Sequence, residues 1–203
     1  MKVEEILKER PYNSTMMTIP QVTLILEELD KVLKNNIEGD IVELGCNAGI
    51  TSTYIQQVLD VNNSKKELHV YDSFCGLPEK KAPDIPADIS NNEFHEGAMK
   101  VEVYNVIDNF IQAKVKMPTI HSGWFSEGVY PEKVAFALFD GDLYQSIYDS
   151  FTQVFPKLSQ GGVVCIHDYG YHKLPGVKKA CQDYIGLDYD IIETEHFVGI
   201  IRK

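Results

Sequence analysis

The chain has 203 residues, of which 44% are hydrophobic and 24% charged, and its net charge is −11. This composition predicts one globular domain over residues 1–203, and the charge argues against nucleic-acid or anionic-membrane partners. The charged start MKVEEILKER is unlike a signal peptide, and no apolar run reaches the ~18 residues of a membrane span. Four cysteines without paired spacing indicate reduced thiols. We therefore expect a cytoplasmic protein.

The expected elements alternate between helix and strand. Thr18 and Gln21 have the spacing of a capping box, and apolar residues at helical spacing follow as far as Leu33. Strands are predicted at residues 39–45, 66–72, 119–123, 134–140 and 161–168, helices at 51–59, about 98–113, 143–154 and 177–184, and a closing hairpin at 188–203. This order predicts an α/β fold with a parallel sheet, whose ligands bind beyond the carboxyl ends of the strands.

The connection at residues 73–97 is rich in proline, aspartate and asparagine. A loop of this length in a compact domain is usually functional or disordered. We interpret it as a lid over the substrate, and we expect acceptor specificity to lie there and in the helix that follows.

The loop after the first strand carries Glu43, Gly45, Asn47 and Gly49. A dinucleotide fingerprint would need glycines at positions 45, 47 and 50, and only the first is present. An acid two residues before the first glycine suits S-adenosylmethionine (SAM) better, because a carboxylate can accept a hydrogen bond from its ammonium group and no pyrophosphate needs a site. An ordinary glycine-rich turn is the alternative at this point.

The second strand ends at Asp72, where a carboxylate can accept hydrogen bonds from both ribose hydroxyls of an adenosine. A simple turn aspartate is the alternative. We place Asp72 and its neighbour Ser73 among the cofactor-binding residues. Trp124 could lie along the adenine ring, although packing in the core is as good an interpretation.

Two aspartates, Asp140 and Asp142, flank Gly141 at the end of the apolar run 134–139. Neighbouring carboxylates at a strand tip are costly unless they are solvated, cap a helix or hold a cation. One interpretation is therefore a turn whose aspartates cap the helix that starts near Leu143. The other is a cation site.

Several longer motifs, in this order, resemble the macrocin O-methyltransferase family: GDIVELGCNAG, YDSFCGLP, HSGWFSEGV, LFDGDLYQSIYDSF and PKLSQGGVVCIHDYG. The resemblance covers about residues 15–185. It implies SAM-dependent methyl transfer to sugar hydroxyls of glycosylated metabolites. It also implies a class I methyltransferase fold, with a seven-stranded, mostly parallel sheet and an antiparallel C-terminal hairpin, a magnesium ion at the strand tips, and often a homodimer.

The resemblance also assigns residues. It implies that Asp140 and Asp168 bind the metal and that Asp142 is the general base. His167 stands where the family commonly has a second aspartate. Because imidazole suits manganese, iron or zinc better than magnesium, the ion could be Mg²⁺ or Mn²⁺. His167 could be a metal ligand, the general base itself, or structural.

The leading hypothesis is a metal- and SAM-dependent O-methyltransferase that acts on a sugar hydroxyl of a metabolite or glycan. Two alternatives remain at this point. One is a non-enzymatic SAM- or glycan-binding module with a decayed metal site. The other is a nucleotide-dependent oxidoreductase, against which the missing glycines count.

Overall fold

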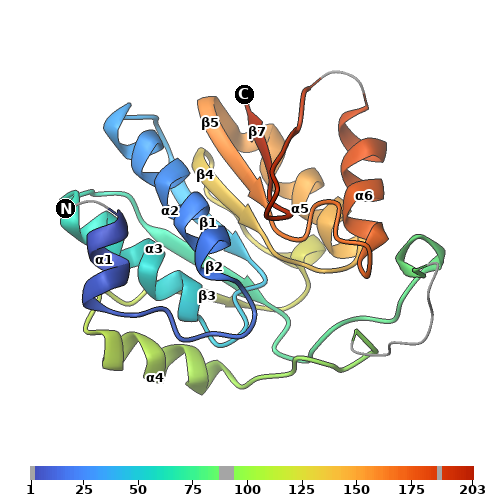
Figure 1. Cartoon of the computed structure of the whole chain (residues 1–203), viewed down its shortest axis with the longest axis horizontal. Helices are drawn as coiled ribbons and strands as arrows, with labels where there is room; N and C mark the ends of the chain where they lie inside the picture. The colour runs from blue at the N-terminus through green and yellow to red at the C-terminus, as the bar shows by residue number, and fades with distance from the viewer. Residues whose placement is uncertain (1–2, 87–93, 187–188) are drawn as a thin grey trace.

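The computed structural model describes residues 3–86, 94–186 and 189–203. Over these residues the chain forms a seven-stranded sheet between two layers of helices (Figure 1). The strands are β1 Asp40–Leu44, β2 Leu68–Asp72, β3 Thr119–Ser122, β4 Val134–Phe139, β5 Leu158–Ile166, β6 Ile192–Glu193 and β7 Gly199–Arg202. The α-helices are α1 Val3–Glu9, α2 Ile19–Lys34, α3 Ile50–Val61, α4 Val103–Ala113, α5 Tyr144–Val154 and α6 Pro175–Ile185, and the 3₁₀ turns are η1 Ala82–Asp84, η2 Phe125–Glu127 and η3 Phe155–Lys157.

The strand order is β3-β2-β1-β4-β5-β7-β6. Strands β1 to β5 pair in parallel, and β7 pairs antiparallel with both β5 and β6. The expected mostly parallel sheet with a C-terminal antiparallel hairpin is therefore confirmed. The strand order reverses between β1 and β4, and a crevice at such a point, outside the carboxyl ends of the strands, is where ligands bind in open α/β sheets.

Side chains of the central strands alternate between two cores, as the period of a strand requires. In β4, Phe136 and Leu138 pack with α1 to α4 on one face, whereas Ala137 and Phe139 pack with α5 and α6 on the other. All six residues of β4 are buried. Such burial on both faces explains why the strand reads as an unbroken apolar run.

The capping box predicted at the start of α2 is confirmed. The Gln21 backbone N–H donates to the Thr18 hydroxyl, and the Thr18 backbone N–H donates to Oε1 of Gln21 at 2.7 Å. The helix expected over residues 98–113 begins only at Val103, because Gly97 and Met99 have positive φ angles that interrupt a right-handed helix. In the part of the chain that the structure describes, none of the helices is both long and apolar enough to cross a bilayer.

Candidate active site

A cavity of about 770 Å³ opens along the carboxyl edge of the sheet. All but one of the site residues expected from the sequence line it, namely Glu43, Gly45, Asn47, Asp72, Ser73, Trp124, Asp140, Asp142, His167 and Asp168. The exception is Gly49, which has a φ of 75° and is the N-cap of α3. Trp124 is 42% exposed at the cavity, which contradicts the interpretation that it packs in the core.

The loop after β1 needs its first glycine for a steric reason. Gly45 has a φ of 95°, and a Cβ there would lie 1.9 Å from the backbone oxygen of Asp140. Asn47 also has a positive φ, and its backbone N–H donates to Oδ2 of Asp72 at 2.8 Å. Its side-chain amide donates to the Met99 carbonyl at 2.9 Å. Asn47 therefore joins the tips of β1 and β2 to the segment that precedes α4.

Glu43 and Asp72 give one end of the cavity two carboxyl groups, of which Glu43 is buried and Asp72 partly buried. Glu43 is 1% exposed, and its carboxylate accepts a hydrogen bond from the Ser52 hydroxyl. Burial raises the pKa of Glu43 to about 8, although the Ser52 bond opposes the shift. Burial likewise raises the pKa of Asp72, against hydrogen bonds from the backbone N–H groups of Phe74 and Asn47. A cationic ligand would relieve this cost of burying two acids.

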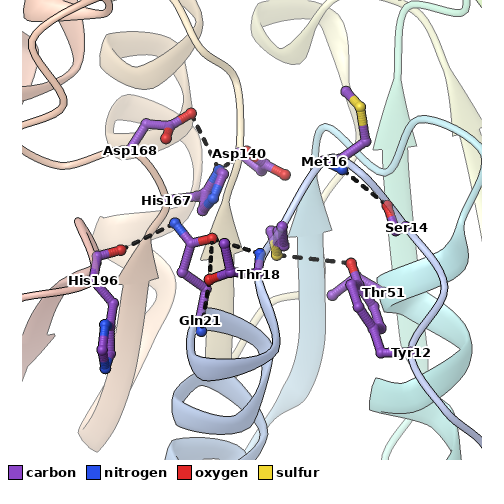
Figure 2. A network of polar contacts seen from close by, with 11 residues as sticks. Tyr12, Ser14, Met16, Thr18, Gln21, Thr51, Asp140, His167, Asp168 and His196 are labelled. Carbon is purple, nitrogen blue, oxygen red and sulfur yellow. Dashed lines mark hydrogen bonds and ion pairs between the residues drawn. The ribbon is translucent and has the colours of Figure 1, made fainter.

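Asp140, His167 and Asp168 converge at the tips of β4 and β5 (Figure 2). Nδ1 of His167 lies 2.8 Å from Oδ1 of Asp140 and 3.3 Å from Oδ2 of Asp168. One potential ligand atom from each of the three residues lies within 4.8 Å of the others. The three side chains therefore form the cluster that the sequence predicts at this edge.

The carboxylates of Asp140 and Asp168 raise the pKa of His167, whose side chain is only 5% exposed. Burial alone would lower the pKa of the imidazole, but the charge and hydrogen bond of Asp140, with those of Asp168, outweigh burial and raise it well above its usual value. The second ring nitrogen, Nε2, is buried and has no hydrogen-bond partner among the described residues.

Asp142 lies beside this cluster with a left-handed backbone, φ 59°. Burial, together with repulsion from Asp140 and Asp168, raises the pKa of Asp142 well above that of a free aspartate. Its carboxylate lines the cavity. Within the described residues it accepts no hydrogen bond, so its oxygen lone pairs remain available to a ligand.

The interpretation that Asp140 and Asp142 cap the following helix is wrong. Helix α5 begins at Tyr144, its N-cap is Leu143, and that residue makes no side-chain cap. Instead, the Tyr144 N–H donates to Oδ1 of Asp84 at 2.6 Å. The cap comes from a residue far away in the sequence, so both aspartates of the DGD motif are left to the cavity.

Residues 14–17, in the segment before α2, form part of the cavity wall, which no pattern in the sequence had indicated. In Figure 2 this segment leads from Ser14 past Met16 to Thr18, beside the Asp140, His167 and Asp168 cluster. At the start of α2, Nε2 of Gln21 donates to the His196 carbonyl at 3.0 Å. The capping box predicted where the helix starts but not where the preceding chain lies. Of the expected lid, residues 73, 76–79, 81 and 94 line the cavity, whereas 87–93 lie outside the described residues, so the lid stays a prediction.

The sequence of the chain is similar to those of known proteins. The sequence profile of the macrocin-O-methyltransferase family (TylF) matches residues 8–195. An 8-demethyl-8-(2,3-dimethoxy-alpha-L-rhamnosyl)-tetracenomycin-C 4'-O-methyltransferase from Streptomyces olivaceus is 30% identical over 179 residues, 85% of this chain and 67% of its own. A demethyldecarbamoylnovobiocin O-methyltransferase from Streptomyces niveus is 28% identical over 87% of this chain and 70% of its own.

The fold agrees as well. The solved structure of the O-methyltransferase NovP matches with a TM-score of 0.79 at 24% identity, over 91% of this chain and 80% of that one. This likeness confirms the expected class I methyltransferase fold. The relatives are transferases, which removes the support for an oxidoreductase or a non-enzymatic binding module. The chain belongs to the macrocin-O-methyltransferase family and is a SAM-dependent O-methyltransferase.

Proposed function

We propose that the protein transfers the methyl group of SAM to a sugar hydroxyl of a glycosylated small molecule, with a divalent cation at Asp140, His167 and Asp168. The observation that carries this proposal is a single cavity in which the acids Glu43 and Asp72 share space with that cluster. The names of the two relatives, a rhamnosyl-tetracenomycin methyltransferase and a novobiocin-type methyltransferase, support acceptors of the same chemical class.

SAM fits the end of the cavity formed by β1 and β2. The two oxygens of Asp72 each accept one backbone hydrogen bond, and a carboxylate has about four lone-pair sites in all, so it can also accept from both ribose hydroxyls. Glu43 would accept a hydrogen bond from the ammonium of the methionine part. Gly45, Asn47 and Ser73 would contact the cofactor, and the exposed Trp124 ring offers a surface for adenine.

The cluster at β4 and β5 fits a divalent cation by its donor chemistry. Two carboxylates and one imidazole already converge, and the mutual crowding of the carboxylates would be relieved by positive charge. A nitrogen ligand favours Mn²⁺ or a similar ion, although Mg²⁺ could be held with additional water. When bound, the ion would lower the pKa of a coordinated acceptor hydroxyl.

Asp142 is suited to take the proton from the acceptor. A sugar hydroxyl is a very weak acid, comparable with water at about 15.7, and an ordinary aspartate near ~4 is a poor base for it. Burial raises the pKa of Asp142 and so makes its carboxylate a stronger base. His167 fits this role less well, because the proposal uses its imidazole as a ligand of the cation.

The test is turnover with SAM and Mn²⁺ or Mg²⁺ on a panel of rhamnosides, aminocoumarin glycosides and macrolide glycosides, each paired with its aglycone. We expect S-adenosylhomocysteine to form, and the glycoside to gain the mass of one methyl group, only when the sugar is present. Asp142→Asn should abolish turnover but leave SAM bound, since it removes the base and keeps the shape. Equal methylation of glycosides and aglycones would refute the sugar as acceptor.

A further inference from the structure

Asp84 is a buried acid that the proposed mechanism does not use. It ends the 3₁₀ turn η1, in the connection after β2, and is 1% exposed. Its Oδ1 accepts from the Tyr144 N–H at 2.6 Å and its Oδ2 from the Lys81 N–H at 3.0 Å. A carboxylate that is costly to bury is thus held by two backbone donors from different parts of the chain.

The bond to Tyr144 places Asp84 at the N-terminus of α5. The first N–H groups of a helix lack partners within the helix, and the N-cap Leu143 has no polar side chain to supply one. A negative charge is also favoured at this end by the helix dipole. Asp84 therefore serves as the cap of α5, although it precedes Tyr144 by 60 residues.

Helix α6 has a glycine, Gly176, where it packs against the Asp84–Tyr144 hydrogen bond. A Cβ on Gly176 would lie 1.9 Å from Oδ1 of Asp84 and 2.9 Å from the backbone nitrogen of Tyr144. Any other residue would push the carboxylate away from the nitrogen that it caps. Three separate segments, around Asp84, Tyr144 and Gly176, therefore meet at a single carboxylate.

This cap is two residues from Asp142. The backbone between β4 and α5 turns sharply, because Asp142 is left-handed and the Leu143 N–H donates to the Gly141 carbonyl at 2.6 Å. At the β4 end, the Asp140 N–H donates to the Leu44 carbonyl at 2.8 Å. At the α5 end, among the described residues, the turn is held by the hydrogen bond from the Tyr144 N–H to Asp84. A left-handed non-glycine backbone persists only when its surroundings hold it in place.

We propose that Asp84 is a positioning residue that sets the orientation of Asp142 through the cap on Tyr144. This inference rests on the proposed role of Asp142 as base. The segment that carries Asp84 also lines the cavity at Lys81, whose ammonium donates to Oε1 of Gln145 at 2.9 Å. The same anchor therefore fixes one wall of the cavity and the adjacent base.

The test compares Asp84→Ala and Gly176→Ala with Asn105→Ala. Gly176→Ala displaces the Asp84 carboxylate without removing any polar group. Asn105→Ala removes the capping-box acceptor at the start of α4, where Oδ1 of Asn105 accepts from the Glu102 N–H at 3.0 Å, outside the cavity. It controls for the loss of a helix cap as such. For each folded variant we would measure kcat with a glycoside of the panel that the wild type methylates, the Kd for SAM, and amide hydrogen exchange of the peptide spanning residues 140–147.

We expect Asp84→Ala and Gly176→Ala to lower kcat about ten- to a hundredfold, since a displacement near 1 Å can cost 10²-fold. SAM affinity should change less than about twofold, because the cofactor end keeps its own contacts. Exchange should rise in residues 140–147 of both variants but not in Asn105→Ala. Asp84→Asn should recover part of kcat, since its amide oxygen can still accept from Tyr144.

Wild-type kcat in folded Asp84→Ala, or unchanged exchange in residues 140–147, would overturn the positioning role. A loss of SAM affinity equal to the loss of kcat would also overturn it, as it would indicate general disruption of the site. The proposed function can be refuted independently of this positioning role. If the wild-type enzyme methylates no glycoside, or if Asp142→Asn is fully active, the base is wrong, whereas the exchange measurement still decides whether Asp84 holds this loop.

Discussion

Gly45 and Asp140 approach so closely that a Cβ on the glycine would lie 1.9 Å from the backbone oxygen of the aspartate. Gly45 belongs to the loop proposed for SAM, and Asp140 belongs to the cluster proposed for the metal. The two binding regions therefore share a backbone contact between β1 and β4. A change at either residue should affect the cavity at both ends.

Gly45→Ala is expected to destabilise the fold. Gly186→Ala is the matched control, since Gly186 also has a positive φ but a Cβ there would have no atom within 4 Å. Both variants carry the strain of a left-handed alanine, but only Gly45→Ala forces backbone apart, which adds about 1–3 kcal/mol. Urea denaturation would measure both free energies of unfolding. Equal losses would show that the β1–β4 contact relaxes without cost.

Asp72→Ala should weaken SAM binding about tenfold or more, because hydrogen bonds to charged groups contribute roughly 1.5–3 kcal/mol each. Asp72→Asn, which keeps the shape and one acceptor oxygen, should lose less. Titration calorimetry would give both dissociation constants. Because Asp72 also holds the Asn47 and Phe74 backbones, the unfolding temperature of each variant must be compared with the wild type. An unchanged SAM affinity in folded Asp72→Ala would remove the ribose assignment.

Chelation tests the cation at the β4 and β5 tips. A fully chelated enzyme should lose turnover, and Mn²⁺ should restore it at least as well as Mg²⁺, because an imidazole ligand favours the softer ion. His167→Asp should shift the preference toward Mg²⁺ by giving an all-oxygen set of ligands. Undiminished turnover after chelation would exclude the metal mechanism.

Features that depend on residues close together in the sequence could be predicted, whereas contacts between distant residues could not. The Thr18–Gln21 cap joins residues three positions apart, and the location of the acids at the strand tips follows from the topology of a parallel sheet. Both features could therefore be predicted from the sequence. The Asp84–Tyr144 cap joins residues 60 positions apart and leaves no periodic pattern. The later start of α4 depends on the left-handed Met99, a non-glycine residue for which the sequence has no signal.

SAM binding should release a proton at neutral pH. With the pKa of Glu43 at about 8 in the free enzyme, the group is mostly protonated at pH 7. The ammonium of SAM would favour the carboxylate and lower this pKa. Calorimetry in buffers of different ionisation enthalpy would count the protons, and Glu43→Gln is the control, expected to release none from this site. The same proton count for the variant and the wild type would contradict the contact.

Glu43 also affects the pH dependence of stability in the free enzyme. Its pKa rises from 4.5 to about 8 on folding, so between these values the folded state binds a proton that the unfolded state does not. The stability contributed by this proton is present below pH 4.5 and is lost as pH rises toward about 8. Glu43→Gln should therefore flatten the fall of the unfolding free energy across this window. A fall as steep as that of the wild type would assign the pH dependence to other groups.

Trp124 is the chain's single tryptophan, and it lies on the cavity wall with 42% of its surface exposed. Its indole emission should therefore respond to whatever enters the cavity, without interference from any second indole. Stacking of an adenine on the ring would quench the signal and shift it to shorter wavelength, as bulk water leaves the exposed face. Stopped-flow fluorescence could then follow the arrival of SAM and the departure of S-adenosylhomocysteine in real time, on unlabelled protein and before any acceptor has been identified.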